Sequence, residues 1–188
     1  MSTETHPLTS DRWADLERLF GANGANSGCW CMWWFQTNKE FETCHGEENR
    51  ASLRARVESG PAPGLLAYID GATAGWCAVG PREGYGRLSR SRVLKPVDGV
   101  PAWSIVCLFV GRAFRGRGVT GALIEAAVAY AAEQGATIVE GYPKDAPVDG
   151  RLAAGDAFVG TPGMFERAGF REAARGSKTR TTVRKQLP

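Results

Sequence analysis

The stretch that decides the fold runs from Val106 to Ile124 and reads VCLFVGRAFRGRGVTGALI. An apolar run ends at Val110, a basic turn rich in glycine follows, and a helical pattern begins at Val119. The first N–H groups of a helix have no partner within it, and the helix dipole adds partial positive charge there. Arg115 and Arg117 add full charges. The stretch therefore predicts a site for a phosphate or pyrophosphate.

The spacing of the glycines narrows the choice of ligand. It is not the mononucleotide P-loop, because no G-K-[ST] follows the glycines. Arg115-x-x-Gly118-x-Thr120 instead resembles the [RQ]-x-x-G-x-[GA] signature of the GCN5-related N-acetyltransferases (GNAT), with Thr120 where that family usually has Gly or Ala. The alternative is a basic turn without a ligand. The resemblance implies that acetyl-coenzyme A is bound by Leu108, Phe109, Val110, Arg115, Gly116, Arg117, Gly118, Val119, Thr120 and Gly121.

Length and composition indicate one domain over residues 1–188, and the order of its expected strands and helices makes it an α/β domain. Hydrophobic residues make up 43% of the chain, which is enough for a core and argues against disorder. A strand over Trp103–Val110, a crossover helix from Val119 and a strand over Thr137–Tyr142 predict a parallel βαβ unit. The family resemblance covers residues 103–170 firmly. It implies a mixed, mostly antiparallel sheet with splayed central strands and flanking helices.

The rest of the chain gives further expected elements. Helices are expected around residues 10–20 and 46–59, and strands over 65–69 and 74–79. Asp70-Gly71 between those strands is a hairpin signal. Residues 80–100 and 143–160 are expected to be loops, and residues 171–185 to supply the last strands.

Gly28 to Phe35 is an unusual run in which every residue after the glycine is apolar or aromatic. It is too short for a helix of usual length, so we expect an extended segment. In the family that it resembles, this region shapes the acceptor pocket, and Trp30, Trp33 and Trp34 are the candidate substrate-binding residues. Aromatic walls suit an apolar or cationic body. Plain core packing is the alternative, since aromatic side chains are mostly buried.

The cysteines raise the question of a metal site. Cys29, Cys31, Cys44 and His45 are soft ligands, but their spacing does not match common zinc sites. We therefore expect no metal and reduced, buried thiols. Five cysteines without a framework spacing, and no leader or membrane-spanning run, favour a cytoplasmic protein.

The resemblance implies an enzyme that transfers acetyl from acetyl-coenzyme A to an amine, and we expect the amine of a small molecule. The family usually donates a proton from a tyrosine in its last helix, where this chain has Phe165. Glu140 and Tyr142 alternate onto one face of the neighbouring strand and are the candidate base and acid. The alternative is that no side chain protonates the sulfur.

Phe165 also supports a competing reading, an acyl-coenzyme A sensor or interaction module without catalysis. The net charge of +3 is mild, and the basic tail lacks interleaved aromatic residues, so neither nucleic acid nor membrane is expected as a partner. The sequence leaves a homodimer open and does not name the acceptor.

Overall fold

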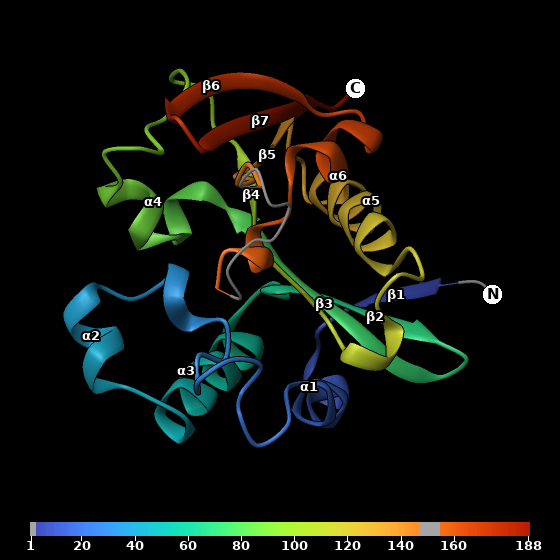
Figure 1. The fold of residues 1–188 in the computed structure, drawn as a ribbon. Coiled ribbons are helices and arrows are strands. Elements are labelled where there is room, and N and C mark those ends of the chain that lie inside the picture. Colours follow the sequence, from blue (N-terminus) through green and yellow to red (C-terminus); the bar gives the residue numbers. More distant parts are fainter. Residues whose placement is uncertain (1–2, 147–154) are drawn as a thin grey trace.

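The strand before the glycine turn, β4 (Trp103–Val110), is central in a sheet of seven strands in the computed structural model, which describes residues 3–146 and 155–188. The strand order is β1-β2-β3-β4-β5-β7-β6 (Figure 1). β4 and β5 run parallel, and the other neighbouring pairs are antiparallel. The other strands are β1 (Thr3–Pro7), β2 (Gly64–Ile69), β3 (Ala72–Pro81), β5 (Ile138–Gly141), β6 (Arg171–Ser177) and β7 (Arg180–Gln186).

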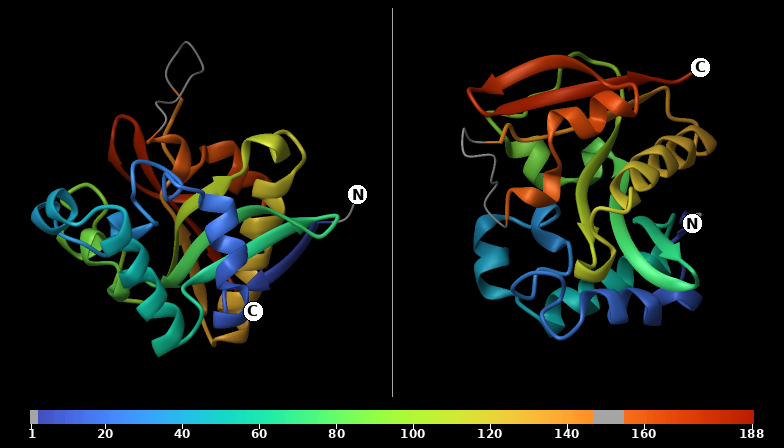
Figure 2. Two further views of the ribbon diagram at one scale, coloured as in Figure 1. Left: turned by 90° about the horizontal axis from the view of Figure 1, so that it is seen from below. Right: turned by 45° about the vertical axis from the view of Figure 1, so that its right-hand side comes forward.

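Helices cover both faces of the sheet (Figure 2). On one face α5 packs across β2, β3 and β4 and contacts α6. On the other face α1 packs against β3, beside α3. The helices are α1 (Trp13–Phe20), α2 (Asn38–Thr43), α3 (Glu47–Ser59), α4 (Gly86–Arg90), α5 (Val119–Glu133) and α6 (Pro162–Arg167).

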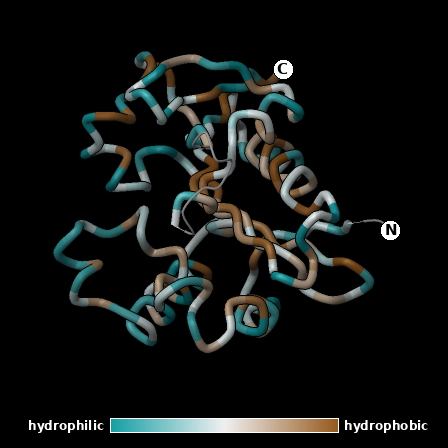
Figure 3. The backbone as a smooth tube through the Cα atoms, viewed as in Figure 1, coloured by the Kyte–Doolittle hydropathy of each residue, from teal (hydrophilic) through white to brown (hydrophobic). Residues whose placement is uncertain are grey.

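Alternation along the strands divides the interior into two cores. In β3, Trp76 and Ala78 face α1 and α3, whereas Cys77 and Val79 face α5. The apolar residues gather along the strands and α5 in Figure 3. Asp70 and Gly71 both have positive φ, 49° and 76°, which gives the two-residue hairpin between β2 and β3.

Several expected elements differ from those observed. The run from Gly28 to Phe35 is not extended: Trp30 and Cys31 have positive φ, and Met32–Trp34 forms a short 3-10 helix. Residues 80–100 include the helix α4, and β1 and α2 were not expected. Of the expected loop over 143–160, residues 147–154 lie outside the described residues. Among those described, no helix combines the length and apolar character needed to cross a bilayer.

Candidate active site

A glycine turn joins β4 to α5, as the sequence predicts. Gly116 and Gly118 lie at φ of 74° and 80°, a region that side chains other than glycine enter at a cost. The N–H groups from Arg115 to Gly121 have no backbone acceptor among the described residues, and the first bond into α5 is from Ala122 to Gly118. A Cβ on Gly116, Gly118 or Gly121 would meet open space. The turn is therefore a ring of donors with room for an anion.

A cavity of about 720 Å³ lies against this turn. Most of the predicted cofactor residues line it: Leu108, Val110, Arg115, Gly116, Gly118, Val119, Thr120 and Gly121. Phe109 and Arg117 are not among its lining residues. Phe109 points to the opposite face of the sheet, where its ring packs against Phe20 and Phe158. The far wall comes from residues 157–160 and from α6.

The sheet opens beside this cavity. β5 pairs with β4 only from Trp103 to Ile105, although β4 continues to Val110. A bulge lies at the point of departure, because Val79 pairs with Ile105 and Ala78 pairs with Cys107, which leaves Val106 as the extra residue. The second half of β4 thus presents one unpaired edge of backbone N–H and C=O groups, as expected for splayed strands.

A second cavity, of about 390 Å³, adjoins the first. Phe158 lines both cavities. Two neighbouring residues of β4 line one cavity each, Leu108 the first and Cys107 the second. Trp33 and Trp34 line it together with Cys29 and Cys31. We call it the middle cavity. Burial raises the pKa of the Cys29 thiol to about 11, and the pKa of Cys107 is raised well above its usual value by the contact with Cys31 and by burial.

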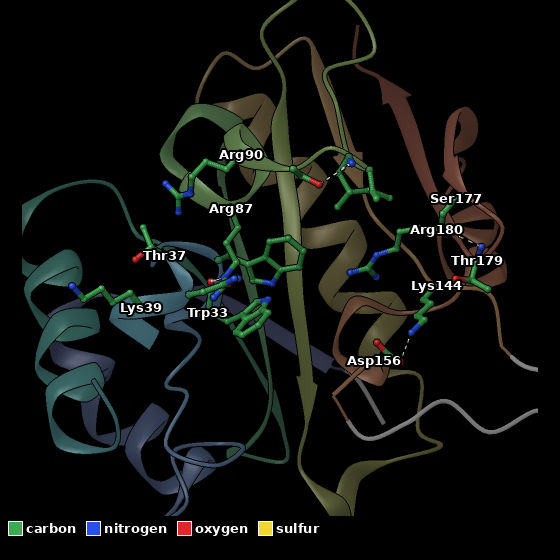
Figure 4. Close-up of a pocket in the computed structure, with 15 residues that line it drawn as sticks. Trp33, Thr37, Lys39, Arg87, Arg90, Lys144, Asp156, Ser177, Thr179 and Arg180 are labelled. Carbon is green, nitrogen blue, oxygen red and sulfur yellow. Dashed lines mark hydrogen bonds and ion pairs between the residues drawn. The ribbon is translucent and has the colours of Figure 1, made fainter. Parts of the chain in front are cut away.

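A third cavity, of about 760 Å³, opens outward from the middle cavity and shares Trp33, Trp34, Asp156 and Arg180 with it. We call it the outer cavity (Figure 4). Its walls come from segments far apart in the sequence. One side is formed within residues 33–39 and 87–94, around α2 and α4, and the other side by Lys144, Asp156, Ser177, Thr179 and Arg180. The basic side chains that line it are Lys39, Arg87, Arg90, Lys144 and Arg180.

Glu140 and Tyr142 do share one face, as predicted, but both are buried. Glu140 is 0% exposed, and its carboxylate is 3.0 Å from Arg82 and 2.7 Å from Arg184. The Tyr142 hydroxyl donates to Glu140 at 2.6 Å and lies 2.7 Å from that of Ser104. Burial raises the pKa of Tyr142 and the nearby carboxylate raises it further, so the phenol stays protonated. Neither residue lines the three cavities, and their acid–base roles stay a prediction.

Two aromatic residues lie elsewhere than in the cavities. Trp30 is 6% exposed and stacks on Trp13, so it belongs to the core, whereas Trp33 is 42% exposed. Phe165 is fully buried and packs edge-on against Phe170 and over Gly141.

In the part of the chain that the structure describes, no cluster of His, Cys, Asp or Glu has the geometry to hold a metal ion.

The residues that sequence reasoning missed are mainly the cations of the outer cavity. Arg87 and Arg90 stand in a stretch that the sequence predicts to be a loop. Lys144 and Arg180 are brought together by a bridge between their backbones. No local signal marks either residue, because the bridge joins positions far apart in sequence.

Comparisons with known proteins identify the family and agree with the fold. The sequence model of the acetyltransferase (GNAT) family matches residues 28–144 of this chain. A search of curated proteins found no match. Two solved structures share the fold at 13% identity: an acetyltransferase of the GNAT family from Listeria monocytogenes, with a TM-score of 0.62 over 98% of this chain and 95% of that one, and the PaiA N-acetyltransferase from Thermoplasma acidophilum in complex with coenzyme A, with 0.55 over 100% of both.

A third, the polyamine N-acetyltransferase of Drosophila melanogaster, has a TM-score of 0.56 at 13% identity over 99% of this chain and 100% of that one. It is an enzyme that catalyses the formation of N-acetylagmatine. Likeness at this level of identity concerns the fold alone. The family model covers well over half of the chain, from the aromatic run to the end of β5, and so this protein belongs to the GNAT acetyltransferase family.

Proposed function

We propose that this protein transfers the acetyl group of acetyl-coenzyme A to the amine of a small molecule. The observation that carries the proposal is the row of three adjoining cavities at the opening between β4 and β5. One end of the row is a ring of unpaired backbone donors, and the other is open to solvent. Such a row can hold an anionic cofactor at one end and an acceptor at the other.

The residues at the first cavity fit coenzyme A. The amides from Arg115 to Gly121 would bind the pyrophosphate, since they lack acceptors and the glycines leave space above them. The unpaired edge of β4 beyond Ile105 would bind the amides of the pantetheine arm. When bound, acetyl-coenzyme A supplies an activated thioester. Thr120 lines the same cavity, and its hydroxyl is a further donor.

The chain contributes mainly position and the exclusion of water. The acceptor nitrogen bonds to the acetyl carbon, the C–S bond breaks with its electron pair on sulfur, and one proton passes from nitrogen toward the sulfur or to water. Trp33 and Trp34 line the middle cavity, where the two reactants would meet. The sequence predicts Glu140 and Tyr142 as the candidate base and acid for this proton transfer, and they remain so, although their burial favours a positioning role.

The alternative is an acyl-coenzyme A sensor without catalysis, and Phe165 favours it. A buried phenyl ring at the position of the usual tyrosine cannot donate a proton. Two measurements separate these functions: calorimetry with coenzyme A, and release of free thiol from acetyl-coenzyme A across a panel of amines. The enzyme gives both signals. If coenzyme A binds but no amine causes release of free thiol, the protein is a sensor and not an enzyme.

Trp33→Ala tests the acceptor end. We expect it to raise the acceptor KM several-fold and to leave the acetyl-coenzyme A KM within about twofold, because the ring lines only the middle and outer cavities. Trp30→Ala is the matched control, since it removes a core ring and should lower stability by about 3–5 kcal/mol. Equal increases in both KM values for Trp33→Ala would contradict this placement.

A further inference from the structure

The outer cavity concentrates positive charge. Of the described residues that line it, five are cations and one, Asp156, is an anion. The whole chain has 23 Lys and Arg against 20 Asp and Glu, a net charge of only +3, so this one cavity accounts for an excess larger than that of the entire protein. Asp156 forms an ion pair with Lys144, and none of the other four cations forms an ion pair with it, although its charge also acts on Arg180. A cavity of this kind attracts anions.

Arg180 is the cation nearest to the proposed site of transfer, because it lines both the middle and the outer cavity. Its position is fixed by the backbone bridge to Lys144, and its Nη1 donates to the carbonyl of Tyr142 at 3.2 Å. Within residues 3–146 and 155–188, no carboxylate forms an ion pair with it. In Figure 4 its guanidinium extends across the cavity from the side of β7.

Three other half-buried arginines are paired with carboxylates, whereas Arg87 and Arg180 form no such pair within the described residues. Arg82 and Arg184 hold Glu140, and Arg50 holds Glu17. Burial lowers the pKa of Arg180, and the nearby Asp156 carboxylate offsets this only in part. A buried charge is costly unless a partner of opposite sign is present. An anionic group on the ligand would supply that partner.

The opposite wall supports the same conclusion. The Arg87 guanidinium stacks over the Trp33 ring at 3.4 Å from its centroid and donates to the Trp33 carbonyl and the Asn38 side chain. Arg90 donates to the carbonyl of Gln36 at 3.3 Å. Both donate to neutral groups, and neither forms an ion pair with a carboxylate among the described residues, although the exposed Glu40 carboxylate interacts with the Arg90 charge. Hydroxyl groups that could also bind an anion line the same cavity, at Thr37, Ser91, Ser177 and Thr179.

We infer that the acceptor is an acidic amine, which carries a carboxylate or phosphate group near its amino group, and that Arg180 binds this group. The inference rests on the proposed acetyltransferase function and names the substrate class. The same cations oppose a polyamine by repulsion. They also lower the pKa of a nearby ammonium group, which favours the neutral amine that can attack the thioester.

Matched pairs of amines test this inference. Phenylalanine is compared with phenethylamine, which lacks the carboxylate, and phosphoethanolamine with ethanolamine, which lacks the phosphate. Each is titrated by calorimetry into the protein saturated with coenzyme A, and each is assayed for thiol release with acetyl-coenzyme A. We expect the acidic member of at least one pair to bind about 10–100-fold more tightly, as charge-assisted hydrogen bonds allow. Raising ionic strength from about 50 to about 500 mM should shrink this preference.

Variants assign the preference to Arg180. Arg180→Gln should weaken binding of the acidic amine about tenfold or more and leave its neutral counterpart within about twofold. Arg180→Lys should restore part of the loss, and an unchanged melting temperature shows that the variants fold. Arg54→Gln removes an equal charge from exposed α3, which lines none of the three cavities, and should have no effect.

The two arms fail separately. If the neutral member of both pairs binds as well as the acidic one, or if Arg180→Gln weakens both alike, the inference is overturned whether or not thiol is released. If acidic amines bind through Arg180 but none releases thiol, the substrate class stands for a binding protein and the proposed transfer is wrong. A preference for phosphate over carboxylate, or the reverse, identifies which acidic group the cavity binds.

Discussion

The two ends of the cavity row are built in different ways. The cofactor end comes from one continuous stretch, from the second half of β4 to the first turn of α5. The outer cavity takes its walls from separate stretches around Trp33, Arg87, Lys144 and Arg180. The first end depends on backbone groups, and the second depends on side chains that tertiary structure brings together. One can be found from local sequence, and the other requires the fold.

The two ends also differ in the interactions that hold them in place. The glycine turn needs only two residues at positive φ and a helix start. The outer cavity rests on a buried ionic network, since Arg180 donates to the carbonyl of Tyr142, whose hydroxyl donates to Glu140. Changes in the network should therefore act on stability, whereas changes in the turn should act on binding.

The largest effect is expected for Glu140→Gln. It removes the charge that two arginines share in a site of 0% exposure, and an uncompensated buried charge costs about 3–5 kcal/mol in the free energy of unfolding. Urea denaturation measures this loss. Asp98→Asn is the control, because Asp98 pairs with the same Arg184 at an exposed position, and the loss should be much smaller than that of Glu140→Gln. Equal losses in the two variants would show that burial does not govern the network.

The next effect concerns the cofactor end. Gly118→Val forces a β-branched residue to a φ of 80° and fills the space above the amides, so coenzyme A affinity should fall at least about 100-fold, or about 2.7 kcal/mol. Calorimetry measures the affinity. Gly135→Val is the control, since Gly135 has φ of 84° at the opposite end of α5. Both variants should lose similar stability, and only the first should lose affinity. Unchanged affinity in Gly118→Val would rule out the turn as the phosphate site.

What the sequence could predict follows the same division. β4 was predicted with its observed bounds, and the turn and the start of α5 were predicted with it, because apolar runs and glycine conformations are local signals. Trp30 shows the limit. It stands three residues from Trp33 in one aromatic run, yet one ring stacks in the core and the other lines two cavities. The positive φ values at Trp30 and Cys31, which turn the run on itself, carry no residue signature.

Tyr142→Phe is expected to have a smaller effect and to decide between two roles. Removing the hydroxyl takes a partner from Glu140, Ser104 and Arg82, and should lower stability by about 1–2 kcal/mol. If Tyr142 acts only through this network, kcat stays within about twofold at every pH once folded protein is counted. A fall in kcat without a fall in melting temperature would support the proton donor that the sequence predicts. Tyr130→Phe, which removes one longer bond to Ala62, is the control.

The smallest effect concerns the middle cavity, where the two ends meet. Burial raises the pKa of Cys29 to about 11, so little thiolate exists at neutral pH and alkylation by iodoacetamide should be slow and rise up to about pH 11. The folded pKa exceeds the unfolded value, so the stability that this thiol contributes is present below about pH 9 and lost as pH rises toward 11. Cys29→Ser should flatten that part of the stability curve. Mass spectrometry of alkylated peptides gives the rate for Cys29 alone, and rapid labelling at pH 7 would contradict the burial of the thiol. Slower labelling with coenzyme A and acceptor both bound than with either alone would place the meeting point of the two ends in this cavity.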